Sequence, residues 1–354
     1  MKKYKMLLGL IVVLFCACNN KEQIIREQPE NVATPKNMVW VPGNTFTQGA
    51  KENDRLALEH EKPAHSVSVD GFFIDITEVT NASFKKFVDE THYVTTAERP
   101  INWDEFKKSL PEGTPKPADS LLQPGSLVFN DKVKNVTDYT DFRQWWKWQT
   151  GANWRHPEGK NSNIIGKDNY PVVHISYEDA LAYCKWAKRR LPTEAEWELA
   201  AIGNLKNPVY TWGDEISKMD KEANTWQGNF PNYNSKSDGY SALAAIKSFA
   251  PNSLGIYDMA GNVWEYTQDW YNVNYYQELF SKGETIHNPQ GAAQALNPNN
   301  QYEKEKIIKG GSFLCNESYC SSFRISARMG MAEGSSSNHV GFRTVVDLKM
   351  LQKN

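Results

Sequence analysis

The sequence lacks the features that identify several common classes of protein. Its 354 residues carry a formal net charge of -2 and a pI near 6.4, so no basic excess points to a nucleic-acid partner. It contains no G-x-S-x-G, no H-E-x-x-H and no phosphate-binding glycine motif. No internal repeat divides it. Nucleic-acid binding, nucleotide chemistry and the common hydrolase reactions are therefore not expected.

Cysteine is also scarce, with five residues in the chain. Cys16 and Cys18 end an apolar leader, Cys184 is isolated, and Cys315 and Cys320 are separated by four residues. One C-x4-C pair without a second pair or a nearby histidine is not a zinc pattern. Two thiolates that meet without other ligands suit Cu(I) far better than Mg2+, Ca2+ or Mn2+, but they require a bend in the chain between them. Spacing and an oxidising compartment alone favour the alternative, a local disulfide.

The N-terminus has the pattern of an export signal. Lysines precede an apolar run over residues 6–15, which is too short to span a bilayer. Ala17 before Cys18 resembles a bacterial lipoprotein box, so we expect a signal peptide over residues 1–17 and lipidation of Cys18. Residues 18–37 then form a disordered tether to the membrane. The expected location is the bacterial cell envelope, at the periplasmic face or the outer-membrane surface, with ordinary secretion as the alternative.

The rest of the chain is expected to form one domain over residues 38–348, followed by a short tail over 349–354. Twelve Trp, sixteen Tyr and seventeen Pro with a mean hydropathy of -0.63 indicate an irregular, loop-rich fold whose segments are held by aromatic side chains. Apolar residues in the range 99–150 follow no sustained helix or strand periodicity. This range is therefore interpreted as a long, partly ordered insertion, called the excursion below.

Local patterns predict a small set of regular elements. We expect strands over 38–46, 171–176 and 341–347, a hairpin over 65–80 around Asp70-Gly71, and helices over 81–90, 177–189 and 191–201. Asn81 is expected to cap the first helix. Thr193 and Glu196 predict a capping box at the third.

Two loop segments are rich in oxygen ligands. The polar residues are Asn224 and Asp238 in one coil, and Asp258, Asn262 and Glu265 around Gly261 in the other. Carboxylates and amides interleaved with backbone carbonyls are what Ca2+ sites need. The spacing is not that of an EF-hand, so ordinary polar loops remain the alternative.

Several stretches together resemble the formylglycine-generating enzyme (sulfatase-modifying factor) family over nearly all of residues 38–348. They are VWVPGNTFTQG, EVTNASFKKFV, GANWRHPEG, PVVHISYEDALAYCKWAKRRLPTEAEWELAA, ANTWQGNFP, PNSLGIYDMAGNVWEYTQDW, KGGSFLCNESYC and GFR. The RLPTEAEWE and GN-W-E elements recur in members with other or no catalysis, so they indicate the fold alone. The cysteine-containing GGSFLCNESYC is specific. The resemblance implies an irregular α+β domain of the C-type-lectin-like superfamily, low in regular structure.

The resemblance also implies an activity and its site. The family oxidises a cysteine in a C-x-P-x-R segment of an unfolded sulfatase to formylglycine with O2. Cys315 and Cys320 would be the Cu(I) thiolates, and Ser312, Trp264 and Tyr319 match residues that shape the oxygen and substrate pocket. Arg328 matches an arginine close to the active site. Structural Ca2+ ligands fall on Asn224, Thr225 (carbonyl), Asp238 and Tyr240 (carbonyl), with a second set on Asp258, Gly261 (carbonyl), Val263 (carbonyl) and Glu265.

The sequence departs from the animal members of the family at one cysteine position, and other functions remain as alternatives. Animal members bridge the cysteine that matches Cys184 to a position that is Thr344 here, so Cys184 is expected to be a buried free thiol. The main alternative function is a non-catalytic scaffold or binding lipoprotein of the same fold, of the gliding- or surface-machinery type. An oxidase of this fold that acts on a small thiol would need an iron-binding histidine triad. His156 and His174 are isolated, and His174 is interpreted as a core residue.

Overall fold

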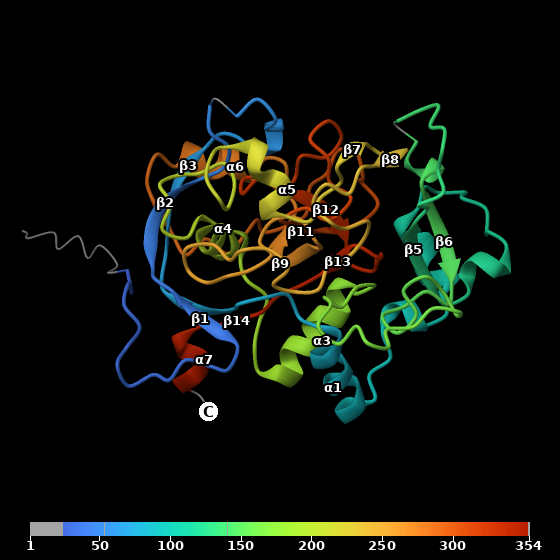
Figure 1. The fold of residues 1–354 in the computed structure, drawn as a ribbon, viewed down its shortest axis with the longest axis horizontal. Helices are drawn as coiled ribbons and strands as arrows, with labels where there is room; N and C mark the ends of the chain where they lie inside the picture. Colours follow the sequence, from blue (N-terminus) through green and yellow to red (C-terminus); the bar gives the residue numbers. More distant parts are fainter. Residues whose placement is uncertain (1–23, 53, 140, 353–354) are drawn as a thin grey trace, which may run out of the picture.

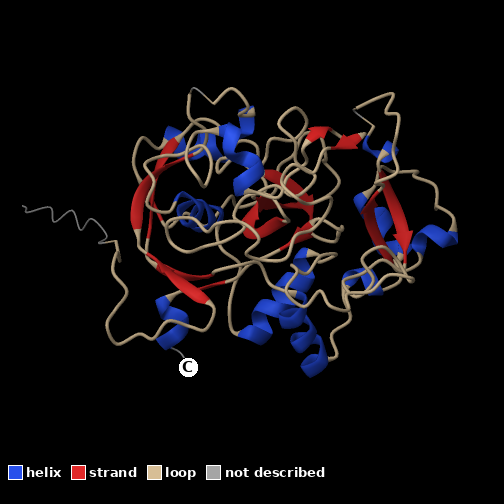
Figure 2. Ribbon diagram, viewed as in Figure 1, coloured by secondary structure: helices blue, strands red, loops and turns tan. Residues whose placement is uncertain are grey.

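Short strands and helices joined by long loops make up the molecule (Figure 2). The computed structural model describes residues 24–352 with the exception of positions 53 and 140. The described chain is a mixed α/β fold with modest regular secondary structure, which confirms the expected fold class. Within these residues, no helix combines the length and the apolar character needed to cross a bilayer.

Two three-stranded sheets lie on one side of the molecule, close to the C-terminus (Figure 1). The first has the strand order β1-β4-β14, and the second has the order β10-β3-β2. Their strands are β1 (Met38–Val41), β2 (Asn44–Gln48), β3 (His65–Val69), β4 (Phe72–Asp75), β10 (Ile286–His287) and β14 (Val345–Val346). The strand expected over 38–46 is thus divided between two sheets at its Pro-Gly turn.

The hairpin expected over residues 65–80 does not form. β3 pairs with β2 and β10, whereas β4 pairs with β1 and β14. At the turn between them, Asp70 N donates to Asn288 Oδ1 and Gly71 N donates to Ile25 O. Because the amides of the turn bond to distant segments, the chain passes from one sheet into the next instead of folding back on itself.

A four-stranded sheet with the order β12-β11-β9-β13 forms the centre of the fold. Its strands are β9 (Trp264–Trp270), β11 (Glu305–Lys309), β12 (Met329–Ala332) and β13 (Val340–Gly341). The strand expected over 341–347 is divided between β13 and β14, because the buried Arg343 between them reaches Glu265 of β9. The strand expected over 171–176 is absent, since His174 with a φ of 60° interrupts the extended backbone.

The three predicted helices are present as α1 (Asn81–Thr91), α3 (Tyr177–Ala187) and α4 (Glu194–Ile202). Thr80, and not Asn81, is the N-cap of α1, because the Thr80 hydroxyl accepts from Ser83 N. The capping box of Thr193 and Glu196 at α4 is confirmed. Every residue of α4 is buried, so this helix supports the central strands β9 and β11 from within the core.

Residues 99–150 are more ordered than expected of an excursion. They contain an antiparallel pair of β5 (Gly125–Phe129) and β6 (Trp146–Thr150), which lies on the side opposite the first two sheets (Figure 1). An apolar cluster joins this pair to the centre through Phe129, Trp145, Trp226, Phe230, Phe313 and Leu314. The excursion therefore packs onto the segment that leads into Cys315.

The other elements are short. The helices are α2 (Trp103–Phe106), α5 (Met219–Glu222), α6 (Tyr275–Ser281) and α7 (Leu348–Gln352), and the strands are β7 (Gly228–Asn229) and β8 (Tyr233–Asn234). The 3-10 turns are Glu59–Glu61, Thr96–Glu98, Lys107–Ser109, Asp119–Leu122, Phe142–Gln144 and Ile216–Lys218.

The described part of the expected tether is attached to the domain. Trp40 Nε1 donates to Arg26 O, and Val32 packs against an apolar cluster built on Phe73. The prediction of a disordered tether is therefore wrong for residues 24–37, which have apolar and hydrogen-bonding partners on the first sheet.

Helix α7 packs on the same apolar cluster from the other end of the chain. Most of the expected tail after residue 348 is consequently helical. The signal peptide over residues 1–17 and the lipidation of Cys18 fall outside the described residues, and both stay predictions.

Candidate active site

Two consecutive glycines lead from β11 into the turn that carries the cysteine pair. Gly310 and Gly311 have φ values of 87° and 72°, in the left-handed region that favours glycine. A Cβ at Gly311 would lie 2.9 Å from Phe323 N. The backbone can therefore turn sharply and pass close to Phe323 only because neither position has a side chain.

The bend required between the two cysteines is present. Asn316 Oδ1 accepts from Ser318 N at 3.0 Å, and the Asn316 amide donates to Trp226 O at 3.0 Å. Cys320 N donates to Asn316 O at 2.9 Å. Asn316 thus folds the segment into a turn, which brings the sulfur of Cys320 back toward that of Cys315.

Cys315 and Cys320 are free thiols in the structure and hydrogen bond to each other. Cys315 is 1% exposed, and Cys320 is half-buried. Burial is the largest cause that raises the pKa of Cys315, whereas the hydrogen bond with Cys315 lowers the pKa of Cys320. Cys320 is therefore the thiol that ionises first. Cys184 is buried and free, as expected.

The two thiols line a cavity of ≈ 410 Å3. Five of the six predicted catalytic residues lie on its wall: Trp264, Ser312, Cys315, Tyr319 and Cys320. They come from β9 and from the cysteine turn, which meet at the edge of the central sheet. No Lys or Arg lines this cavity in the part of the chain that the structure describes.

Arg328 is the sixth predicted catalytic residue, and it does not line the cavity. Its guanidinium donates two hydrogen bonds to the Glu194 carboxylate, at 2.9 and 2.8 Å, and lies 4.2 Å from the centre of the Tyr276 ring. Arg328 is 2% exposed and Glu194 is 1% exposed. The arginine is thus half of a buried ion pair that joins the residue before β12 to α4, and its neighbour Met329 lines the cavity instead.

Aromatic rings form one wall of the cavity. Tyr319 stacks on Phe230 with the ring centres 4.4 Å apart and the planes at 15°. Trp145 meets the same Tyr319 ring edge-on at 5.7 Å. Phe142 and Trp146, also from the excursion, complete this wall. Much of this aromatic wall is therefore supplied by residues 99–150, the region whose sequence shows the least secondary-structure periodicity.

An acidic edge lies on another part of the cavity and consists of Glu303 and Glu305. Glu305 is 6% exposed and accepts from the amides of Asn297 at 2.7 Å and Asn300 at 2.8 Å. Glu303 accepts from Asn300 at 3.3 Å. Neither carboxylate forms an ion pair with any residue that the structure describes, so the cavity has an uncompensated negative edge.

Sequence reasoning missed these groups and a further one, His339, which also lines the cavity. The aromatic residues Trp145, Trp146 and Trp148 were a usable signal, because three such rings in a polar segment need a surface to cover. His339 and Glu305 had no local signal, since they meet the cysteines only through long-range contacts.

Comparison with known proteins places this geometry in a family. A sequence model of the sulfatase-modifying factor enzyme 1-like domain matches residues 22–348. The chain belongs to the sulfatase-modifying factor family. Formylglycine-generating enzymes from Mus musculus and Thermomonospora curvata are 40% and 38% identical to it, and the matches cover 90% and 92% of this chain and 77% and 97% of theirs.

The family also contains a relative without the activity. A protein of Bos taurus named inactive C-alpha-formylglycine-generating enzyme 2 is 34% identical over 87% of each chain. Among solved structures, PvdO from Pseudomonas aeruginosa superimposes with a TM-score of 0.58 at 19% identity, covering 91% of this chain and all of that one. Membership in the sulfatase-modifying factor family thus defines the fold, and the activity has to be argued from the site.

The residues of the first predicted calcium set lie close together in the structure. Asp238 is 9% exposed, and its carboxylate accepts from Thr225 N at 3.0 Å and Tyr240 N at 2.9 Å. Burial is the largest cause that raises the pKa of Asp238. The amide of the neighbouring Asn224 donates to Ala242 O. A carboxylate among ordered loop segments is the kind of donor that Ca2+ binds.

The second predicted calcium set is not assembled around Glu265. Both oxygens of this carboxylate accept from Arg343, at 2.6 and 2.7 Å, and Trp197 Nε1 donates at 2.8 Å. The carboxylate that lies beside Asp258 is instead that of Glu78, which is 2% exposed and has no partner for its Oε2 atom. Burial and then the charge of Asp258 raise the pKa of Glu78 well above its ordinary value.

The carbonyl positions of this second set, Gly261 and Val263, lie at the start of β9, where Gly261 forms a backbone bridge with Asn224. Among the residues the structure covers, no three side chains of His, Cys, Asp or Glu come together as a metal site. A metal in this protein would therefore depend on the two thiols alone, or on carboxylates supplemented by backbone and amide oxygens.

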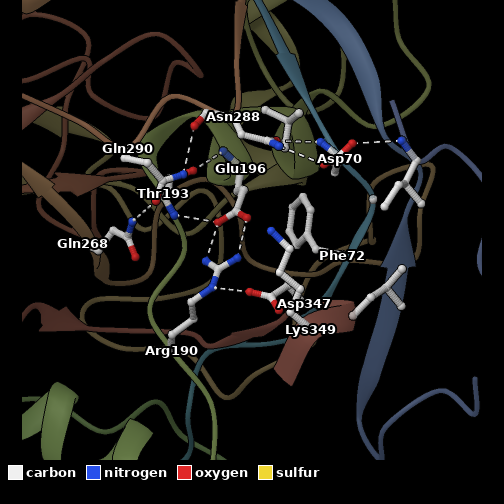
Figure 3. Close-up of a pocket in the computed structure, with 14 residues that line it drawn as sticks. Asp70, Phe72, Arg190, Thr193, Glu196, Gln268, Asn288, Gln290, Asp347 and Lys349 are labelled. Carbon is white, nitrogen blue, oxygen red and sulfur yellow. Dashed lines mark hydrogen bonds and ion pairs between the residues drawn. The ribbon is translucent and has the colours of Figure 1, made fainter. Parts of the chain in front are cut away.

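A second cavity of ≈ 430 Å3 lies near both described ends of the chain (Figure 3). Its polar side chains bond to one another: Arg190 pairs with Glu196 and Asp347, and Asp70 accepts from Asn288. These groups satisfy each other and are therefore not available for a ligand.

Proposed function

We propose that this protein is a copper-dependent oxidase that converts a cysteine in a C-x-P-x-R segment of unfolded sulfatases to formylglycine with O2. The observation that carries the proposal is the placement of two interacting free thiols, Cys315 and Cys320, on the wall of a cavity with an aromatic side. The kinship to enzymes named for formylglycine generation supports sulfatase maturation as the role.

The donor set fits Cu(I). Two soft sulfur ligands, with no group of three His, Cys, Asp or Glu side chains among the described residues, suit a low-coordinate Cu(I) ion. Cys320 loses its proton readily, since the hydrogen bond from Cys315 stabilises the Cys320 thiolate. Bound Cu(I) would supply a position for the substrate sulfur and the activation of O2.

The protein's own residues bind and orient the peptide. The Trp264 indole is 1% exposed and borders the thiols, so it excludes water from one side of the reacting sulfur. The stacked pair of Tyr319 and Phe230 offers a flat apolar surface for the peptide segment. Holding the substrate cysteine next to Cys320 lowers the entropic cost of reaching the transition state.

The acidic edge gives a physical reason for the arginine of the substrate motif. Glu303 and Glu305 are uncompensated by any described cation, and a guanidinium can bind carboxylates with two parallel hydrogen bonds. We assign the arginine of C-x-P-x-R to this edge while the cysteine of the same peptide reaches Cys320.

Calcium has a structural role in this proposal. Asn224, Thr225, Asp238 and Tyr240 would hold one ion, and Asp258 with the Gly261 and Val263 carbonyls would hold a second. The orphaned Oε2 of Glu78 makes that residue a better carboxylate ligand for the second ion than Glu265.

The proposed location is the bacterial cell envelope, with the chain anchored in the membrane through a lipid on Cys18. Support comes from the leader sequence alone. Incorporation of a labelled fatty acid into the intact protein, and its loss in Cys18→Ala, tests the anchor.

Copper titration of the purified protein tests the proposal against a scaffold function, which the inactive relative makes a specific competitor. The proposal expects two titratable thiols at positions 315 and 320, one Cu(I) per chain, and loss of both copper binding and peptide conversion in Cys315→Ser and Cys320→Ser. A disulfide between the two cysteines with no copper affinity would favour the scaffold.

A further inference from the structure

His339 lies beside the cysteine turn and is held from two sides. Trp264 N donates to His339 O at 2.9 Å, which fixes the histidine backbone to β9 at the start of β13. The imidazole packs against the Trp146 ring with the centres 4.8 Å apart. The His339 backbone is therefore anchored to the central sheet, and its side chain packs on residues 99–150 through Trp146.

The anchored ring reaches Ser312. His339 Nδ1 and Ser312 Oγ share a hydrogen bond of 3.0 Å. The same Ser312 oxygen accepts from Leu314 N at 3.2 Å, and Ser312 O accepts from Cys315 N at 2.9 Å. Ser312 N in turn donates to Cys315 Sγ at 3.4 Å. Ser312 is thus the base of the turn that presents Cys315, and His339 is its side-chain link to the sheet.

We propose that His339 is a positioning residue, which holds Ser312 and thereby fixes the Cys315 sulfur in the geometry that the proposed oxidase requires. The role rests on the proposed function for its catalytic consequence, while the effect on Cys315 itself exists in the metal-free protein. Because Ser312 is held in place, the Cys315 sulfur needs less rearrangement when copper and substrate bind.

The chemistry of the ring suits this role. Burial, the largest cause, and the nearby His174 lower the pKa of His339 to about 3, so the imidazole is neutral over the physiological range. A neutral ring can hold the serine hydroxyl without placing a positive charge next to a site for Cu(I). The bond to Ser312 is made by Nδ1, and among the described residues no hydrogen bond is formed by the second nitrogen, Nε2.

Three substitutions separate the two ring nitrogens. Asparagine places an amide close to the Nδ1 position, glutamine places one close to Nε2, and leucine fills similar space without hydrogen bonding. In metal-free protein we measure the rate of iodoacetamide labelling at each cysteine by peptide mass spectrometry. His339→Leu and His339→Gln are expected to label Cys315 about tenfold faster, because the turn opens more often when one hydrogen bond is lost. His339→Asn should stay within about twofold of the wild type.

Cys184 is a matched internal control, since it is buried to a similar degree, lies on helix α3 away from the cysteine turn in the chain, and reports general loosening of the fold. Its labelling should not change in any variant. In a Ser312→Ala background, His339→Leu should add nothing further, because the two residues act as one unit. In the copper-loaded enzyme, His339→Leu should lower Cu(I) affinity and kcat about tenfold and leave KM nearly unchanged.

Unchanged labelling of Cys315 in His339→Leu overturns the proposal, and so does an equal increase at Cys184 and Cys315. Wild-type labelling of Cys315 in His339→Gln together with faster labelling in His339→Asn also overturns the proposal, since Nε2 rather than Nδ1 would then be the atom that holds the turn. If the wild type proves unable to convert the peptide, the proposed function fails, but the labelling result still decides the position of His339.

Discussion

Arg328→Ala is expected to destabilise the fold while the folded fraction keeps its activity. The Arg328 guanidinium makes two hydrogen bonds to Glu194, and both side chains are almost completely buried. Removing the arginine leaves a buried carboxylate without its main partner, which typically costs about 3–5 kcal/mol. Lys309 Nζ lies 3.6 Å from Glu194 Oε1 and compensates part of the charge, so we expect a loss of about 3 kcal/mol, at the lower end of that range.

Thermal unfolding monitored by circular dichroism measures this loss. A change of about 3 kcal/mol in a domain of this size lowers the Tm by roughly 6 °C. The double variant Arg328→Met with Glu194→Gln removes both charges together and is expected to recover most of the stability. Peptide conversion per folded molecule, measured well below the Tm, should equal that of the wild type. An unchanged Tm together with lost conversion would refute the structural role and return Arg328 to the catalytic residues.

Three further predictions concern the substrate, the pH and the ions. Glu303→Gln should lower kcat/KM about tenfold for a C-x-P-x-R peptide. It should have little effect on kcat/KM for the same peptide with citrulline in place of the arginine. Equal effects on both peptides would exclude the acidic edge as the site that binds the guanidinium. Burial raises the pKa of Asp269 to about 8, so the stability that its protonated form contributes is lost as the pH rises through that value. The Tm of Asp269→Asn should therefore fall less between pH 6 and 9 than the wild-type Tm, in a scan at constant ionic strength with about 1 °C precision. Chelation of Ca2+ should lower the Tm of Asp238→Asn by less than that of the wild type, because only the second ion is then left to remove, and a chelator effect of the same size in both would place the first ion elsewhere.

The parts of the fold that local chemistry determines were predictable from the sequence. Thr193 and Glu196 cap α4 through contacts three residues apart, and the structure has that capping box. The bend at Asn316 follows from the requirement that two sulfurs five positions apart share one side. Such features depend on neighbouring residues, which a single sequence displays.

Features that depend on distant partners were not predictable in the same way. Asp70-Gly71 has the composition of a hairpin turn, but Ile25 and Asn288 take its amides and separate β3 from β4. Glu265 was assigned to calcium, although Arg343 occupies both of its oxygens across 78 positions of the chain. Nothing in the local pattern reveals which far segment supplies the counter-charge.

The candidate site shows the same division. The family resemblance identified five of the residues on the cavity wall, because four lie in the cysteine segment and Trp264 lies in another stretch that carries the resemblance. His339 enters the cavity only through the tertiary packing of β13, so it became visible in the structure alone, whereas the aromatic residues of β6 had a sequence signal that did not say where they pack.

Mass spectrometry of a C-x-P-x-R peptide after incubation with the protein, Cu(I), O2 and a thiol reductant tests the central claim most directly. The account predicts exchange of the cysteine thiol for an aldehyde, with no conversion by Cys315→Ser or Cys320→Ser and none of a peptide with serine in place of the cysteine. An unmodified peptide in the presence of copper-loaded, folded wild-type protein would contradict it.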